Sequence, residues 1–272
     1  MRRTLTAVAA LAVAGAAVPA AATTIMIDDF AVDHSVSATQ SGNPASAVAT
    51  GDSSQIIGES RYVQVQTNDP DEGDFATNTS TPGDVLRFAN DPGVLGNILL
   101  VYDGNGAAID PAFSFAAGSA SARSVIGANI TTNGLGGVNL LGGGNLSNFF
   151  NFSIDQTDVD GEAHFWAYAW DMDGRGVEYY ELIEGDAIDE NLPLFAFSMD
   201  GVGDPFGDQG GFMWENVGAL AFSLESISAN YDARLAQITM TVVPLPASAL
   251  LLLGGLGGFA GVAAMKRRRK TA

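Results

Sequence analysis

Short runs of alternating apolar and polar residues recur along the middle of the chain. Phe150, Phe152 and Ile154 alternate with polar residues in one such run, and residues 237–243 alternate in the same way. A period of two is typical of a β-strand that buries one face, and these stretches lack the period of a helix. The runs predict about ten strands, at residues 24–30, 61–67, 85–89, 97–102, 149–154, 163–171, 177–183, 194–199, 217–224 and 237–243.

Clusters of glycine, asparagine, aspartate and proline separate these runs, and such residues favour turns. Many short strands joined by turns predict a mostly β fold, an antiparallel β-sandwich that is jelly-roll-like. We assign residues 23–242 to this sandwich, because about 220 residues are enough to bury a full-sized core. One domain is therefore expected between the two ends of the chain.

One predicted strand carries a row of aromatic rings. His164, Trp166, Tyr168 and Trp170 alternate with apolar residues, so they share one face of the strand. We favour a row that points inward as core, because a sandwich interior needs large side chains. A row that points outward would instead form a surface on which sugar rings can stack. Trp166, Tyr168 and Trp170 are then the candidate ligand-binding residues.

Charge is distributed unevenly along the chain. All 31 acidic residues lie between Asp28 and Asp232, together with only five arginines and no lysine, which gives this region a formal charge of −26. Such a surface repels phosphate backbones and argues against nucleic-acid binding. Cysteine is absent, which excludes disulfides, thiolate metal sites and cysteine nucleophiles. Two histidines are too few for a histidine-rich zinc site.

Several turns are rich in aspartate, and clustered carboxylates with backbone carbonyls can hold calcium. The candidate ligands are Asp158, Asp160, Asp171 and Asp173. The EF-hand pattern fails after Asp173, since Arg175 stands where that loop needs a ligand. We favour solvated turns, because aspartate is a standard turn residue, and structural calcium is the alternative.

The first 22 residues have the three parts of a signal peptide. Arg2 and Arg3 precede an apolar run at 5–18, and Ala20 and Ala22 occupy the small-residue positions before a cleavage point. The apolar run is too short to span a bilayer comfortably. We therefore expect the chain to be exported and cleaved after Ala22.

Residues 243–272 have the composition of a membrane-associated tail. The pentapeptide Val243, Pro244, Leu245, Pro246 and Ala247 precedes an apolar stretch at 249–265, and lysines and arginines follow it. A transmembrane helix over this stretch would be about 25 Å long, at the short limit for a bilayer. The basic end stays cytoplasmic, so the residues before the pentapeptide lie outside.

This order of pentapeptide, apolar helix and basic terminus resembles the PEP-CTERM family of sorting tails, in its VPLPA variant. The resemblance covers residues 243–272 only. It implies that an exosortase, a membrane-embedded protease or transpeptidase, processes the chain near Pro246. Substrates of such enzymes are linked with exopolysaccharide and biofilm matrix, which implies a location in the cell envelope, at the cell surface or in the extracellular matrix. An ordinary single-span anchor is the alternative.

Three segments of the middle, at 24–30, 56–61 and 100–104, carry a looser resemblance. They resemble exported sorting-tail proteins that begin with an Asp-Asp-Phe strand. They are also similar to galactose-binding-like jelly-roll domains, as in some carbohydrate-binding modules. This resemblance implies a sandwich fold and no particular ligand.

Together these features predict an exported, non-enzymatic surface or matrix protein that binds polysaccharide. One alternative is a secreted glycan hydrolase that uses a pair of carboxylates. Another is a purely structural matrix protein without a ligand. We assign no catalytic residue, because the sequence does not show which carboxylates face each other across a cleft.

Overall fold

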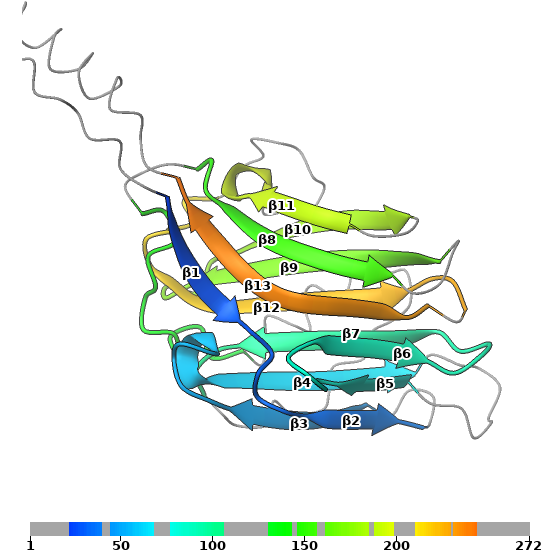
Figure 1. Cartoon of the computed structure of the whole chain (residues 1–272). Coiled ribbons are helices and arrows are strands. Elements are labelled where there is room, and N and C mark those ends of the chain that lie inside the picture. Colours follow the sequence, from blue (N-terminus) through cyan, green and yellow to red (C-terminus); the bar gives the residue numbers. More distant parts are fainter. Residues whose placement is uncertain are drawn as a thin grey trace, which may run out of the picture. The chain divides into compact units, whose positions relative to one another are not determined.

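The computed structural model describes residues 22–39, 44–67, 77–105, 130–142, 146–156, 161–184, 188–198, 210–229 and 231–243. Residues Ala22–Val243 form one compact unit, whose described secondary structure consists of β-strands apart from two short 3-10 helices (Figure 1). Residues 1–21 of the predicted signal segment, the pentapeptide from Pro244 onward and the apolar tail all lie outside the described residues. Within those residues, no helix is long and apolar enough to cross a membrane.

Thirteen strands and two short 3-10 helices make up the described part of this unit. The strands are β1 (Thr23–Asp28), β2 (Ser35–Ala38), β3 (Ala45–Thr50), β4 (Ser60–Thr67), β5 (Thr77–Ser80), β6 (Leu86–Asn90), β7 (Gly96–Tyr102), β8 (Phe149–Gln156), β9 (Glu162–Asp171), β10 (Gly176–Glu184), β11 (Ile188–Pro193), β12 (Val217–Ser226) and β13 (Ala233–Val242). The 3-10 helices are η1 (Ile57–Glu59) and η2 (Leu194–Ala196).

The strands form two antiparallel sheets. Sheet A has the order β11-β8-β13-β6-β5-β2, and β1 also pairs with β13. Sheet B has the order β10-β9-β12-β7-β4-β3. The chain crosses repeatedly from one sheet to the other. For example, β12 lies between β7 and β9 in sheet B, whereas the next strand in the sequence, β13, belongs to sheet A. In Figure 1, β8 and β13 lie in front of β9 and β12.

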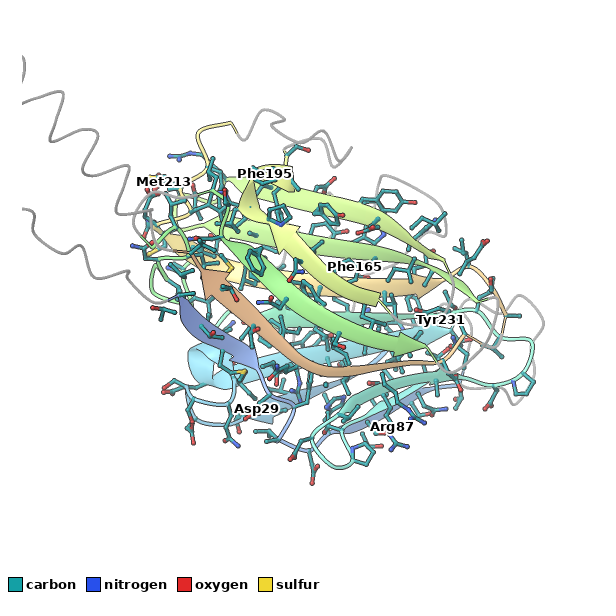
Figure 2. The ribbon with its side chains drawn as sticks, turned by 45° about the horizontal axis from the view of Figure 1, so that its top comes forward. Asp29, Arg87, Phe165, Phe195, Met213 and Tyr231 are labelled. Carbon is teal, nitrogen blue, oxygen red and sulfur yellow. The ribbon has the colours of Figure 1, made fainter. Side chains whose placement is uncertain are left out.

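The two sheets pack face to face over one apolar core. The ring of Phe152 in sheet A lies 5.0 Å from that of Phe165 and 5.1 Å from that of Phe222 in sheet B, both edge-on. Figure 2 labels Phe165. All three rings belong to a cluster to which both sheets contribute. A mostly β, antiparallel β-sandwich is therefore confirmed. An apolar cavity of about 40 Å³, lined in part by Phe165 and Phe222, remains in the core, and it is far smaller than a pocket that holds a sugar.

One predicted strand is wrong. Residues 194–199 were expected to be extended, but Leu194–Ala196 form a 3-10 turn, and the edge strand of sheet A is the preceding β11. Leu194 and Phe197 are both buried. The apolar residues of this segment therefore reach the core from a turn and not from a hydrogen-bonded strand. The backbone N–H of Leu194 donates to the carbonyl of Asn148, which satisfies the turn at its start.

The two ends of the described unit lie side by side. Thr23 of β1 is the register partner of Val242 of β13 (Figure 1). Just after β13, the backbone N–H of Val243 donates to Oδ1 of Asn148 at 2.8 Å. Asn148 is fully buried, and its side-chain amide donates to the carbonyls of Leu140 and Leu141. The first residue of the pentapeptide is thus held by the sandwich.

Candidate functional site

Strand β9 separates two different apolar surfaces. Phe165 and Ala167 belong to the main core between the sheets. Tyr168 and Trp170 belong to a second cluster, against which Trp166 packs. Because side chains alternate along a strand, this second cluster lies on the outer face of sheet B. The predicted alternation is present, but the expectation that the aromatic row fills the sandwich interior is wrong.

The physical reason is the volume that other strands supply to the interior. Phe150 and Phe152 of β8 and Phe222 of β12 contact one another there, with ring centroids 5.1 to 6.3 Å apart. Between them and β9 there is room for the small side chains of Ala167 and Ala169, which are both fully buried. A row containing two tryptophans would not fit in the same space, so the bulky face of β9 points outward.

We call Trp166, Tyr168 and Trp170 of β9 together with Tyr180 of β10 the aromatic shelf. The rings of Trp166 and Tyr168 are 6.3 Å apart and 9° from parallel, and those of Tyr168 and Trp170 are 5.8 Å apart and 18° from parallel. Tyr180 approaches Trp166 to 4.3 Å. Each aromatic pair of this kind adds about 0.5–1.5 kcal/mol beyond the area it buries. The shelf is therefore held in place by its own rings.

Only one end of the aromatic shelf is accessible to a large partner. Tyr168 is 5% exposed and Trp170 is 8% exposed, so both act as packing beneath the surface. Trp166 and Tyr180 are partly exposed, and the neighbouring Leu182 is 39% exposed. A bound molecule would thus contact Trp166 and Tyr180, while Tyr168 and Trp170 support them.

A register row extends the accessible end across sheet B. Tyr180 of β10 pairs with Trp166 of β9, which pairs with Ser223 of β12, which pairs with Leu99 of β7. Gln64 of β4 completes the row beside Leu99. Side chains in register across antiparallel strands lie on the same face. The row therefore begins with two aromatic rings and passes to a hydroxyl and an amide.

The next register row is more polar. It runs from Leu182 through His164 and Glu225 to Asn97 and Gln66. The hydroxyl and amide side chains of these two rows are buried, whereas the side chains of His164 and Glu225 are 21% and 12% exposed, beside Trp166, Tyr180 and Leu182. Sites that bind carbohydrate need this combination, because a sugar ring has an apolar face and a rim of hydroxyl groups.

Ser223 stands out within the first row. Its side chain is 3% exposed, and its hydroxyl has no hydrogen-bond partner among the described residues. A buried polar group without a partner costs about 1–3 kcal/mol. The fold thus leaves a hydrogen bond unmade directly beside Trp166.

A carboxylate stands next to the accessible rings. Oε2 of Glu225 lies 3.5 Å from Nδ1 of His164, and the His164 ring meets Tyr180 edge-on at 5.3 Å. Burial, and then the negative charge of Glu225, raise the pKa of Tyr180 above its ordinary value of 10.0. The Tyr180 hydroxyl therefore stays protonated at neutral pH and remains a hydrogen-bond donor.

Two of the four candidate calcium ligands, Asp171 at the end of β9 and Asp173 in the turn that follows, bind an arginine. Nη1 of Arg175 donates to Oδ2 of Asp171 at 3.1 Å, and Nη2 of Arg175 donates to Oδ2 of Asp173 at 2.5 Å. Oδ1 of Asp171 accepts the backbone N–H groups of Asp173 and Arg175. These residues do not fit a calcium ion, because a guanidinium already neutralises both carboxylates.

The other two candidate ligands, Asp158 and Asp160, lie outside the described residues. Within the part of the chain that the structure describes, no group of three or more carboxylates and histidines is arranged to hold a metal.

Sequence reasoning placed Trp166, Tyr168 and Trp170 on one face but missed Tyr180, Ser223 and Glu225. Tyr180 had a signal: β9 and β10 are consecutive predicted strands, and a tight turn between them fixes which residues face each other. Ser223 and Glu225 had none, because β12 pairs with β9 only through the order of the folded sheet.

Comparison with known proteins adds little to this picture. No family model matches the chain, and no curated protein matches it. A family 11 carbohydrate-binding module from Clostridium thermocellum, solved in complex with a β-1,3-1,4-mixed-linked tetrasaccharide, shares 13% identity at a TM-score of 0.34, with 82% of this chain and 96% of that chain covered. The same kind of module from a cellulosomal cellulase of that organism shares 14% identity at a TM-score of 0.32, with 84% and 98% covered. Values this low establish neither a family nor a ligand.

Proposed function

We propose that this protein binds polysaccharide through the accessible end of the aromatic shelf. The observation that carries the proposal is the outward position of Trp166 and Tyr180, whose rings are 4.3 Å apart and partly exposed on the outer face of sheet B. Tryptophan and tyrosine are enriched where proteins bind partners, because they offer a large apolar face together with a polar group. The partly exposed side chains of His164 and Glu225 beside these rings can form hydrogen bonds with the hydroxyl groups of a sugar.

The proposal includes delivery to the cell surface. Residues 1–22 and 243–272 support export, cleavage after Ala22 and processing by an exosortase near Pro246. In this view the sandwich is a non-enzymatic component of the envelope or matrix, and its glycan-binding face serves to hold it to an extracellular polymer. The intact mass of the protein recovered from its producing cells tests the delivery, because unprocessed ends at both 1 and 272 contradict it.

Binding is tested with the purified protein and the exopolysaccharide of the producing cells, by retardation in gels that contain the polymer. Trp166→Ala and Tyr180→Ala should each weaken retention at least tenfold, which corresponds to about 1.4 kcal/mol. Tyr179→Ala is the matched control, because Tyr179 is the next residue of β10 but packs against the main core on the other face. Tyr179→Ala should leave retention unchanged while lowering stability.

Two results would contradict the proposal. One is the absence of retention for the wild-type protein on this polymer and on a panel of neutral glycans. The other is an equal loss of retention in Tyr179→Ala and Tyr180→Ala. Equal losses would mean that lower stability, rather than the loss of a ring from the aromatic shelf, weakens binding.

A further inference from the structure

The charged groups on the outer face of sheet B around the accessible rings are mostly carboxylates. The acidic residues that alternation and register place on this face of β9, β10 and β12 include Glu162, Glu178 and Glu225. The described residues of these three strands include no arginine or lysine, and His164 is the one group on that face that can become a cation. A sugar acid would meet like charge here.

Cations are favoured at this place for two independent reasons. An ammonium group over the face of a tryptophan or tyrosine is attracted by the ring quadrupole. A carboxylate beside it adds a charge-assisted hydrogen bond, which is shorter and stronger than a neutral one. Trp166 and Glu225 offer both within neighbouring register rows, because Trp166 faces Ser223 and Glu225 lies two residues further along β12.

Ser223 points to a ligand by a separate observation. Its hydroxyl is buried beside Trp166 with no partner among the described residues. The fold has therefore not used this group, whereas the nearby Glu225 lies within reach of His164. An amine or hydroxyl of a bound sugar would supply the hydrogen bond that Ser223 lacks.

We infer that the aromatic shelf takes glycans that carry protonated amino groups, namely polymers of partly or fully deacetylated amino sugars. The ammonium group lies against Trp166 and Glu225, and an adjacent polar group of the sugar bonds to Ser223. This inference rests on the proposed function, since it names the class of polysaccharide that the same surface binds.

The test compares three oligosaccharides of equal length by titration calorimetry at a mildly acidic pH: a glucosamine oligomer, its N-acetylated counterpart and a uronic acid oligomer. The glucosamine oligomer should bind about tenfold more tightly than the N-acetylated one, and the uronic acid oligomer should bind most weakly. Glu225→Gln should remove this preference and leave affinity for the N-acetylated oligomer unchanged. Glu215→Gln, an exposed carboxylate outside the described strands of sheet B, is the matched control and should retain the preference.

Ser223→Ala separates binding from folding. Removing a buried hydroxyl that has no partner should leave stability equal or higher, yet it should weaken the glucosamine oligomer about fivefold. A merely structural role for Ser223 would not move affinity in this way.

The outcomes distinguish the inference from the function it rests on. If both amino-sugar oligomers bind equally and Trp166→Ala abolishes both, the charge preference is wrong and glycan binding stands. If the preference persists in Glu225→Gln or in Trp166→Ala, the attraction comes from the overall negative charge and the inference is wrong. If no oligomer or polymer binds, both proposals fail.

Discussion

Arg61 and Asp28 form a fully buried ion pair that joins the two sheets. Nη1 of Arg61 donates to both carboxylate oxygens of Asp28, at 2.8 and 2.6 Å, and neither side chain has any exposed surface. Asp28 ends β1 of sheet A, and Arg61 lies in β4 of sheet B. The Asp28 carboxylate also accepts the backbone N–H of Phe30 and the hydroxyl of Tyr102, each at 2.8 Å. Four donated hydrogen bonds thus converge on one carboxylate.

Replacing only one member of this ion pair should destabilise the protein far more than replacing both members. Burial raises the pKa of Asp28 above 3.8, although the charge and hydrogen bonds of Arg61 oppose the rise, so the ionised carboxylate depends on its partner. Arg61→Met should lower the free energy of unfolding by about 3–5 kcal/mol, because it leaves a buried charge uncompensated. Urea denaturation of the protein at neutral pH measures the loss.

The double variant Asp28→Asn/Arg61→Met is the control for that explanation. It removes the stranded charge while an amide oxygen still accepts from Phe30 or Tyr102, so it should be more stable than Arg61→Met alone. A double variant as unstable as Arg61→Met or worse would show that lost packing, not unpaired charge, causes the damage.

His34 depends on the same arginine. Nη2 of Arg61 donates to Nδ1 of His34 at 2.9 Å, which requires a neutral ring with its proton on Nε2, and that nitrogen lies 3.3 Å from Oγ1 of Thr79. Burial, and then the Arg61 charge, lower the pKa of His34 from 6.5 to about 4. The His34 ring therefore stays neutral in the native state between about pH 6.5 and pH 4, where the same ring in the unfolded chain takes up a proton.

Stability should fall as pH drops from about 6.5 towards 4. In this window the unfolded chain binds a proton at His34 that the native state does not, so the free energy of unfolding decreases by up to about 1.4 kcal/mol per pH unit. His34→Gln should be less stable at pH 7 but should show a flatter pH dependence in this window. Thermal melts at half-unit intervals measure both slopes, with His164→Gln as the matched variant. A wild-type slope that His34→Gln leaves intact would assign the effect to another group.

The sequence pattern predicted strands where large side chains alternate and failed where they do not. The predicted strands 149–154, 163–171 and 177–183 lie within β8, β9 and β10, and 237–243 falls in β13 except for its last residue. The strands β2, β3 and β5, with the sequences SVSA, ASAVAT and TNTS, gave no signal. Short strands of small residues are stabilised by the ladder of a neighbouring strand, which a local pattern does not reveal.

The candidate site was predictable only in part for a similar reason. Alternation determines which side chains of β9 share a face, but not which face meets the other sheet, because Phe165 and Trp166 are both apolar. That choice depends on the phenylalanines of β8 and β12, which are remote in sequence. The polar half of the site depends on strand order as well, since Glu225 and His164 become neighbours only when β12 pairs with β9.

We expect Arg175, rather than a bound metal ion, to neutralise the carboxylates at the turn after β9. Asp171 is fully buried, and Oδ2 accepts from Arg175 and from the backbone N–H of Met213, which ties two loops together. Asp171→Asn should destabilise the protein by about 1–3 kcal/mol through weakened hydrogen bonds to a charged partner. Any shift of the melting temperature on adding calcium or chelator should be the same in wild type and Asp171→Asn. A calcium response that Asp171→Asn or Asp173→Asn abolishes would restore these residues as ligands.

Gly134 should tolerate no side chain, because two backbones meet there. A Cβ at this position would lie 1.4 Å from the carbonyl oxygen of Asp103, whose buried side chain accepts the backbone N–H of Thr131 and so binds the same loop. Gly134→Ala should therefore destabilise the protein by about 3 kcal/mol or more, since neither backbone can move away without breaking this contact.

Gly136 is the matched control: a Cβ there meets nothing within 4 Å, but its φ of +70° disfavours other residues. Gly136→Ala should cost only about 1–2 kcal/mol. Equal losses in urea denaturation would mean that backbone conformation, rather than the approach of Asp103 to Gly134, limits this loop.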